Sequence, residues 1–124
     1  MTREILLIDD DEDELEVFAG ALYSFDKTIQ CTQAKNLKEA LDFLRYNSPF
    51  YIFIDFNMPK MNGLECLSEI RKLSKHDQSR IVLYSNYISK EMNEKAIALG
   101  AYNCIKKPSM INILAKNLKE ILKS

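Results

Sequence analysis

Five short segments of the chain have the composition of β-strands, and four of them are nearly continuous apolar runs. They cover residues 4–8, 28–32, 50–54, 81–85 and 102–105. Apolar residues at successive positions, without alternation, are typical of strands that helices cover on both faces of a parallel sheet. The pattern therefore predicts five buried or half-buried parallel strands.

Helical periodicity fills the intervals between these strands. Helices are expected over residues 12–23, 37–46, 64–74, 90–99 and 110–123. In the first of them, Leu15, Phe18 and Leu22 repeat at i, i+3 and i+7, and Asn36 is placed to cap the second. Strict strand–helix alternation implies right-handed crossovers. The predicted fold class is α/β, a (βα)5 doubly wound five-stranded parallel sheet.

Length and composition fit one globular unit. The chain has 124 residues, 47% hydrophobic and 28% charged, so we expect residues 1–124 to form a single domain. Its longest aliphatic run, 5–8, is far shorter than the roughly 20 residues of a membrane span. The three cysteines form no CxxC pair, which favours a reducing compartment. We expect a cytoplasmic protein without membrane attachment.

A net charge of −1 conceals an acidic segment. Seven of the eight residues 9–16 are acidic, and without them the chain has 17 basic against 11 acidic residues. Acids favour a helix N-terminus, so a solvated helix start is one interpretation. The last twenty residues are lysine-rich, but no recognition motif accompanies them, and we do not expect nucleic-acid binding.

Polar residues stand where the strands end, which is where ligands bind in doubly wound sheets. They are Asp9, Asp10 and Asp11 after the first strand, Asp55 after the third, Ser85 at the end of the fourth, and Lys106 and Lys107 after the fifth. An isolated aspartate at a strand end is often only a turn or capping residue. The joint placement predicts carboxylates, a hydroxyl and an ammonium group at one edge.

Carboxylates that cluster in this way need protons or a cation at neutral pH. Oxygen donors without His or Cys favour a hard cation, for which Mg²⁺ is the natural choice. A carboxylate at such an edge can also attack a phosphoryl donor and form an acyl phosphate. Lys107 or Lys106 would neutralise phosphoryl charge, and the Ser85 hydroxyl would donate a hydrogen bond.

The sequence contains the segments ILLIDDDED (5–13), FIDFNMPKMNG (53–63), IVLYS (81–85), AIALGA (96–101) and KKP (106–108). Together they resemble the receiver domain of two-component response regulators, and the chain has a size similar to the single-domain chemotaxis regulators. The resemblance implies a flavodoxin-like fold with strand order 2-1-3-4-5, and a receiver without an output domain.

The resemblance also implies roles for the residues at the strand ends. Asp55 is similar to the phosphorylated aspartate, and also to a metal ligand. Asp10 is similar to the direct Mg²⁺ ligand and Asp9 to a neighbour acting through water. The backbone carbonyl of Asn57 is similar to the third protein ligand. Asp11 would be an ordinary helix-start acid.

Two further residues resemble the groups that contact the phosphoryl oxygens. They are Ser85 and Lys107, the latter joined to Pro108 by a bond that the resemblance implies to be cis.

The chain departs from the family pattern at three positions. Asn86 replaces a small residue, Ser109 an aromatic one, and Cys104 the aromatic residue of the last strand. Tyr102, two residues from Cys104, would share its face. The gap would be partly filled by Tyr102, or by Tyr84 or Tyr87 from the fourth strand and its loop.

These resemblances imply a phosphorylation-dependent signalling protein that is not an enzyme, although it catalyses its own phosphorylation and dephosphorylation. The donor would be a sensor histidine kinase or histidine phosphotransfer protein, because His76 lies in a polar stretch away from the strand ends. The signal would pass by protein contact or phosphorelay to a target that the sequence does not name. Two alternatives stay open. A Mg²⁺-dependent phosphohydrolase with an Asp nucleophile would have a second Asp where Asn57 stands, and a degenerate module would never be phosphorylated.

Overall fold

Strands and helices alternate along the whole chain in the computed structural model, which describes residues 2–58, 61–73 and 78–123. The strands are β1 (Thr2–Ile8), β2 (Gln30–Ala34), β3 (Pro49–Asp55), β4 (Arg80–Ser85) and β5 (Asn103–Lys106). The helices are α1 (Glu12–Tyr23), α2 (Leu37–Tyr46), α3 (Gly63–Arg71), α4 (Lys90–Ala98) and α5 (Ile111–Leu122). These elements confirm the predicted α/β class.

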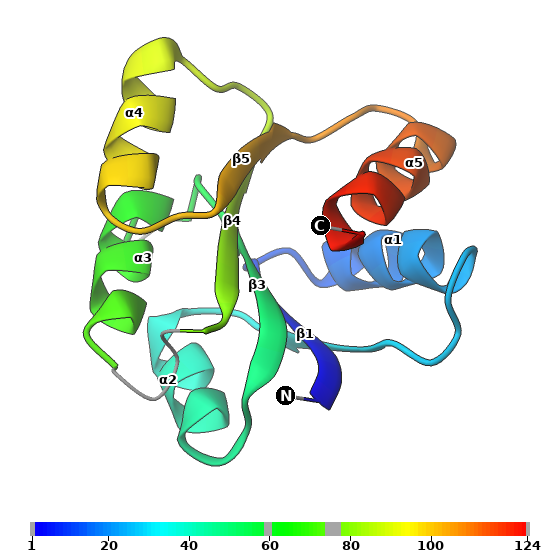
Figure 1. The fold of residues 1–124 in the computed structure, drawn as a ribbon, viewed down its shortest axis with the longest axis horizontal. Coiled ribbons are helices and arrows are strands. Elements are labelled where there is room, and N and C mark those ends of the chain that lie inside the picture. Colours follow the sequence, from blue (N-terminus) through cyan, green and yellow to red (C-terminus); the bar gives the residue numbers. More distant parts are fainter. Residues whose placement is uncertain (1, 59–60, 74–77, 124) are drawn as a thin grey trace.

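All strand pairs are parallel, and the sheet has the order β2-β1-β3-β4-β5. The predicted order 2-1-3-4-5 is therefore confirmed. Figure 1 shows the sheet between two helical layers, with α2, α3 and α4 on one face and α1 and α5 on the other. The strand order reverses at β1, because β2 is added on one side of β1 and β3 on the other, so β1 and β3 lie at the switch point where such sheets bind ligands.

The central strands are buried on both faces, which explains their continuous apolar sequence. In β1, Leu6 and Ile8 face the cluster under α2, α3 and α4, whereas Ile5 and Leu7 face the cluster under α1 and α5. All four side chains are fully buried. A polar group at the end of such a strand is therefore held by a backbone that packing fixes from both sides.

The strands β1, β3 and β4 contain their predicted ranges and extend slightly beyond them, whereas β2 and β5 are shifted toward the C-terminus. β2 begins two residues later than expected, because Thr28 belongs to a turn in which its N–H and hydroxyl both donate to Asp26 Oδ1, at 2.9 and 2.6 Å. β5 begins at Asn103 rather than residue 102. Tyr102 therefore precedes β5, and the alternation of side chains along a strand does not apply to it.

Helix caps agree closely with the sequence. Asn36 caps α2 as predicted, with its side chain accepting from the Glu39 N–H at 2.9 Å. Asn62 caps α3 and Ser89 caps α4 in the same way. These caps fix the start of each helix on the side of the sheet where the strands end.

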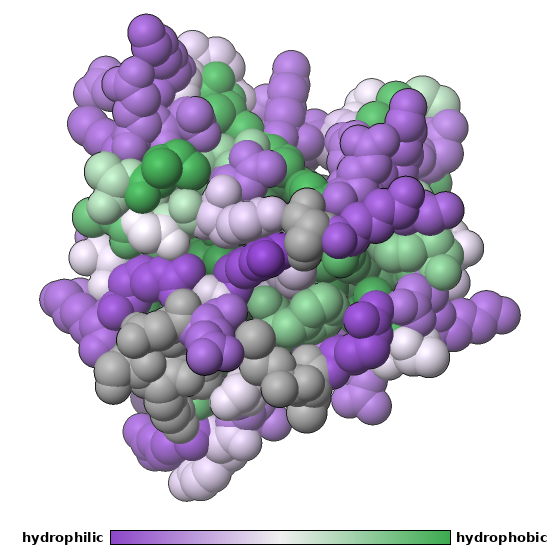
Figure 2. Space-filling view, viewed as in Figure 1, coloured by the Kyte–Doolittle hydropathy of each residue, from purple (hydrophilic) through white to green (hydrophobic). Residues whose placement is uncertain are grey.

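Hydrophilic side chains cover much of the face in Figure 2, and hydrophobic ones show between them. Within the described residues, no helix has both the length and the apolar character needed to cross a membrane.

Candidate functional site

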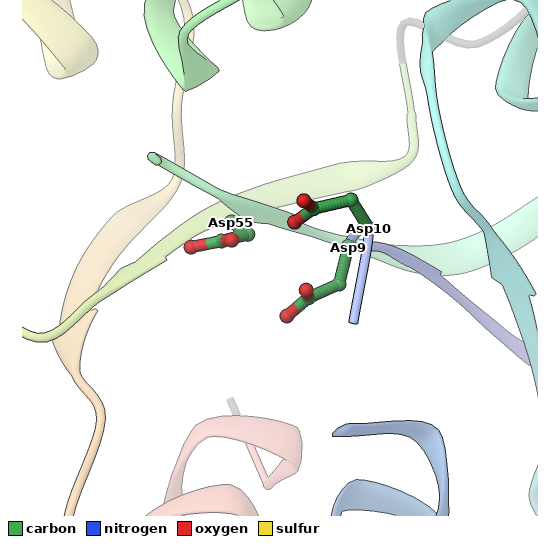
Figure 3. Close-up of side chains that lie close together, drawn as sticks. All are labelled: Asp9, Asp10 and Asp55. Carbon is green, nitrogen blue, oxygen red and sulfur yellow. The ribbon is translucent and has the colours of Figure 1, made fainter. Parts of the chain in front are cut away.

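Three aspartates from two neighbouring strands meet at the carboxyl edge of the sheet. Asp9 follows β1 and is 1% exposed, Asp55 ends β3 and is 5% exposed, and Asp10 is open to solvent. One carboxylate oxygen from each lies within 4.8 Å of the others. Figure 3 shows the three side chains gathered at the ends of the strands. The predicted carboxylate cluster is therefore present.

The acidic loop, residues 9–11, is held by side chains at both of its ends. Asp9 Oδ1 accepts the Asp11 N–H at 3.0 Å, and Asp11 caps α1 by accepting the Asp13 N–H at 2.9 Å. From β2, Gln33 Nε2 donates to the carbonyls of Asp9 and Asp11, both at 2.8 Å. Asp11 is thus the helix-start acid that we predicted. Sequence reasoning missed Gln33, because its role depends on the register of β2 against β1.

The turn after β3 is shaped around Asp55. The Asn57 N–H donates to Asp55 Oδ1 at 3.3 Å, and the Asn57 side chain is exposed. Gly63 begins α3 directly behind this turn, where a Cβ would lie 2.9 Å from the Phe56 Cα and 3.2 Å from the Asp55 carbonyl oxygen. Only a glycine allows this approach without moving the backbone that carries Asp55.

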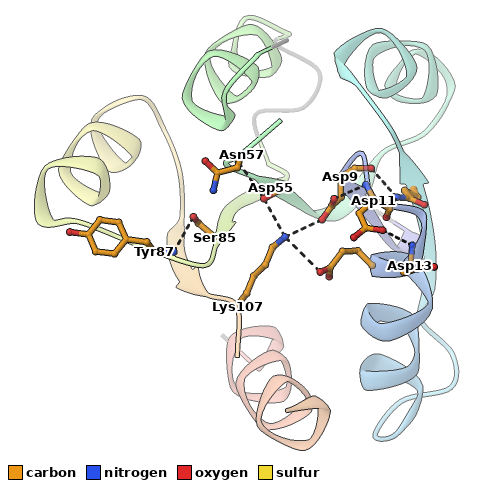
Figure 4. Close-up of polar contacts among 10 residues, drawn as sticks. Asp9, Asp11, Asp13, Asp55, Asn57, Ser85, Tyr87 and Lys107 are labelled. Atoms are coloured by element: carbon orange, nitrogen blue, oxygen red, sulfur yellow. Dashed lines mark hydrogen bonds and ion pairs between the residues drawn. The ribbon is translucent and has the colours of Figure 1, made fainter. Parts of the chain in front are cut away.

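Lys107 brings a positive charge to the aspartates from the end of β5. Its Nζ lies 3.3 Å from Asp9 Oδ2 and 3.3 Å from Asp55 Oδ1 (Figure 4). The same ammonium lies 5.0 Å from the centroid of the buried Tyr84 ring. Lys106 is exposed. Of the two lysines left open by the chemistry alone, Lys107 is the one at the site.

The bond between Lys107 and Pro108 corrects one expectation. The resemblance implied a cis peptide bond, but the described residues contain none, so this bond is trans. Lys107 reaches the carboxylates with its preceding backbone held in the sheet, since its N–H donates to the Ser85 carbonyl at 2.7 Å. The β4–β5 pairing thus carries Lys107 to the edge where Ser85 ends β4.

Burial and charge crowding disfavour a fully ionised site. Burial raises the pKa of Asp55, and the Asp9 charge raises it further, while Lys107 works in the opposite direction. For Lys107, burial alone would lower the pKa, but Asp55, Asp9 and Glu14 outweigh it and raise the pKa. The negative charges of Asp9, Asp55 and Glu14 thus exceed the single positive charge of Lys107.

Glu14 is the second functional candidate that sequence reasoning missed. It lies in the first turn of α1, and its Oε1 is 3.8 Å from Lys107 Nζ. Burial raises the pKa of Glu14, Lys107 opposes this, and Asp9 adds to it. In the sequence Glu14 is one acid among seven, with no signal to separate it from its exposed neighbours.

Comparison with known proteins agrees with this geometry. A family model described as the response regulator receiver domain matches residues 5–119. This chain belongs to the response regulator receiver domain family. It is 28% identical over 120 residues to a chemotaxis protein CheY homolog of Campylobacter jejuni, covering 96% of this chain and 92% of that protein.

Solved receiver structures have the same fold. A two-component response regulator from Legionella pneumophila is 26% identical, with a TM-score of 0.83 over 97% of both chains. The chemotaxis response regulator CheY4 of Vibrio cholerae is 24% identical, with a TM-score of 0.83 over 98% of this chain and 99% of that one. The predicted flavodoxin-like receiver fold is confirmed.

In this receiver, Ser85 ends β4 at the same edge of the sheet as the aspartates, and the residue is only 1% exposed. The Tyr87 N–H donates to Ser85 Oγ at 3.3 Å, while the Tyr87 ring is exposed and points away from the site (Figure 4). Asn86 between them is also exposed. Asp55 pairs with Tyr84, so Ser85 is the next residue along β4 at this edge, and it is followed by two exposed residues, Asn86 and Tyr87.

The face assigned to Tyr102 was wrong. Cys104 packs against the cluster under α2, α3 and α4, whereas the Tyr102 ring lies 4.4 Å from the Arg80 guanidinium and 6.2 Å from the Tyr51 ring. Tyr51 belongs to the cluster on the opposite face of the sheet. Alternation does not apply because Tyr102 precedes β5, and so this receiver has no aromatic ring beside Cys104 from that position. His76 lies outside the described residues.

Proposed function

We propose that this receiver accepts a phosphoryl group on Asp55 in the presence of Mg²⁺ and signals through that modification. The observation that carries the proposal is the meeting of Asp9, Asp10, Asp55 and Lys107 at one edge of the sheet. Membership of the receiver family supports the same activity.

The donor set fits Mg²⁺. The three carboxylates offer oxygen alone, and Asp10 is open to solvent, so water ligands can complete the coordination. Asp10 and Asp55 would hold the ion directly, with the Asn57 carbonyl as the third protein ligand, and Asp9 would act on it through a water molecule. When bound, Mg²⁺ supplies charge neutralisation for phosphoryl oxygens.

The residues of this chain divide the remaining work. A carboxylate oxygen of Asp55 forms the new bond to phosphorus, and the bond from phosphorus to the donor nitrogen or oxygen breaks with its electron pair. Lys107, already 3.3 Å from Asp55, pairs with a phosphoryl oxygen, and the Ser85 hydroxyl donates to another. An imidazole leaving group takes up a proton from water. The product is an aspartyl phosphate.

We propose a histidine kinase or histidine phosphotransfer protein as the donor, and protein contact or phosphorelay as the output. Both follow from the family rather than from this chain alone. The chain would act in the cytoplasm as a phosphorylated switch. It would not be an enzyme with an external product, although its own residues would catalyse phosphorylation and hydrolysis.

Labelling with acetyl phosphate tests the proposal. We expect intact-mass measurement to show one added phosphate with Mg²⁺, and none with a chelator or in Asp55→Asn. Asp42→Asn is the matched control, because Asp42 is an exposed aspartate on α2 and should leave labelling unchanged. Equal labelling of Asp55→Asn would refute the assignment.

The same measurement separates the two alternatives. A degenerate binding module would take up no phosphate in any condition. A phosphohydrolase would instead release inorganic phosphate steadily from a small ester such as p-nitrophenyl phosphate. The structure favours neither, because Asp55 has its charge partners in place, and position 57 offers an exposed amide rather than a second carboxylate.

A further inference from the structure

Lys107 has an ion-pair partner that lies outside the carboxylate cluster. Its Nζ is 3.3 Å from Asp9, 3.3 Å from Asp55 and 3.8 Å from Glu14. The Lys107 side chain is 12% exposed and that of Glu14 is 25% exposed, so both are largely removed from water. Dissolved salt screens an ion pair at such a position less than it screens an ion pair at the surface.

Glu14 differs from the other two partners in what a metal ion would do to it. Among the described residues, the carboxylates close enough to hold one ion are Asp9, Asp10 and Asp55, and Glu14 is not in that group. Bound Mg²⁺ would neutralise Asp9 and Asp55 but leave the charge of Glu14 intact. Glu14 would then be the partner that holds Lys107 most strongly toward α1.

We propose that Glu14 is a positioning residue that competes with the phosphoryl group for Lys107. This inference rests on the proposed function, since it concerns the lysine that meets the phosphoryl oxygens. A phosphoryl group carries a charge of about −1.5 to −2 at neutral pH. Glu14 opposes that charge in two ways, by retaining Lys107 and by repelling the phosphoryl oxygens directly.

The same negative charge has the opposite effect on a cation. Glu14 adds to the negative potential around the aspartates and so favours Mg²⁺ binding before any phosphoryl group arrives. Removing its charge should therefore weaken Mg²⁺ binding and strengthen phosphoryl binding. A residue that only supports the fold would weaken both, which makes the pair of signs diagnostic.

The test compares Glu14→Gln with wild type by calorimetry, first with MgCl2 alone and then with beryllofluoride at saturating Mg²⁺. We expect the Kd for Mg²⁺ to rise about two- to fourfold and the Kd for beryllofluoride to fall about three- to tenfold. The initial rate of labelling by acetyl phosphate should rise by a similar factor. Glu14→Ala should give the same signs.

Glu16→Gln is the matched control. Glu16 lies on the same helix and carries the same charge, but it is exposed, so both Kd values should stay within about twofold of wild type. A Kd for beryllofluoride that is unchanged or higher in Glu14→Gln would overturn the role of Glu14 alone. Wild-type protein that binds no beryllofluoride would overturn the proposed function as well.

Discussion

Asp10 and Asp11 are adjacent in the sequence, but their carboxylates lie in different environments. Asp10 contributes an oxygen to the carboxylate cluster, whereas Asp11 Oδ1 accepts the Asp13 N–H at the start of α1. The first can bind a cation directly, and the second is already used in capping. Removing the charge of Asp10 should therefore affect Mg²⁺ binding differently from removing the charge of Asp11.

We expect Asp10→Asn to weaken Mg²⁺ binding at least about tenfold, because a charged ligand becomes a neutral one. Asp11→Asn should change the Kd by less than about twofold, since asparagine is an equally good N-cap. Titration of backbone amide NMR shifts with MgCl2 measures both. Comparable losses in the two variants would show that Asp11 also faces the ion.

At the level of single residues, the sequence predicts those whose position follows from a strand end. Asp9, Asp55, Ser85 and Lys107 all lie where the alternation of strands and helices places them. Glu14 and Gln33 were not predicted, because the role of each depends on contacts between elements that are distant in the sequence. Gln33 needs the pairing of Leu7 with Gln33, and Glu14 needs the approach of Lys107 from β5.

The two edge strands, β2 and β5, are both shifted along the chain from their predicted bounds. β2 is an edge strand with only Ala34 buried, so its apolar pattern is weak and its bounds depend on pairing with β1. β5 is also an edge strand, and its later start places Tyr102 against Arg80 and Tyr51. The central strands β1, β3 and β4 contain the whole of their predicted ranges, because burial of both faces gives them continuous apolar sequences.

The position of Tyr102 bears on how a phosphorylated state would spread through the elements. Cys104 is small and partly buried on the face under α4, and Tyr102 is held on the other face by its ring contacts. No ring on β5 is therefore placed to exchange two packings beside Ser85. The loop after β4, with exposed Asn86 and Tyr87, is the element next to Ser85 that is free to respond.

We expect beryllofluoride with Mg²⁺ to produce large amide NMR shifts in residues 85–95 and small ones at residues 103–105 of β5 and in α5. The physical reason is that movement of Ser85 alone leaves the packing of β5 intact, which should give a graded response rather than a two-state one. Cys104→Ser is the control and should give the same pattern. Shifts at 103–105 as large as those at Ser85 would contradict it.

For the whole molecule, the crowded carboxylates link stability to pH and to Mg²⁺. Burial and the charge of Asp9 raise the pKa of Asp55 above the ordinary carboxyl value. The folded state then holds this proton more tightly than the unfolded state. Stability is therefore lost as pH rises, beginning above the unfolded pKa and complete once the pH exceeds the folded pKa. At neutral pH the ionised Asp55 destabilises the protein without metal.

Asp55→Asn removes that charge and keeps the shape, and Lys107 still pairs with Asp9 and Glu14. Without Mg²⁺ at pH 7, we expect the variant to melt about 2–5 °C above wild type, and the gap should close as the pH falls toward the unfolded pKa of Asp55. Thermal unfolding followed by circular dichroism measures this, with Asp42→Asn as the control at an exposed position.

Saturating Mg²⁺ should reverse the order. A ligand that binds only the folded state stabilises it by about 2.7 kcal/mol at a hundred times its Kd, and wild type has the complete set of three carboxylates. The variant lacks one of them and should gain less. The melting curves should therefore cross as MgCl2 is added, with wild type the less stable protein at first and the more stable one at the end. Parallel curves at all Mg²⁺ concentrations would show that Asp55 does not contribute to the metal site, because a common ligand set gives both proteins the same gain.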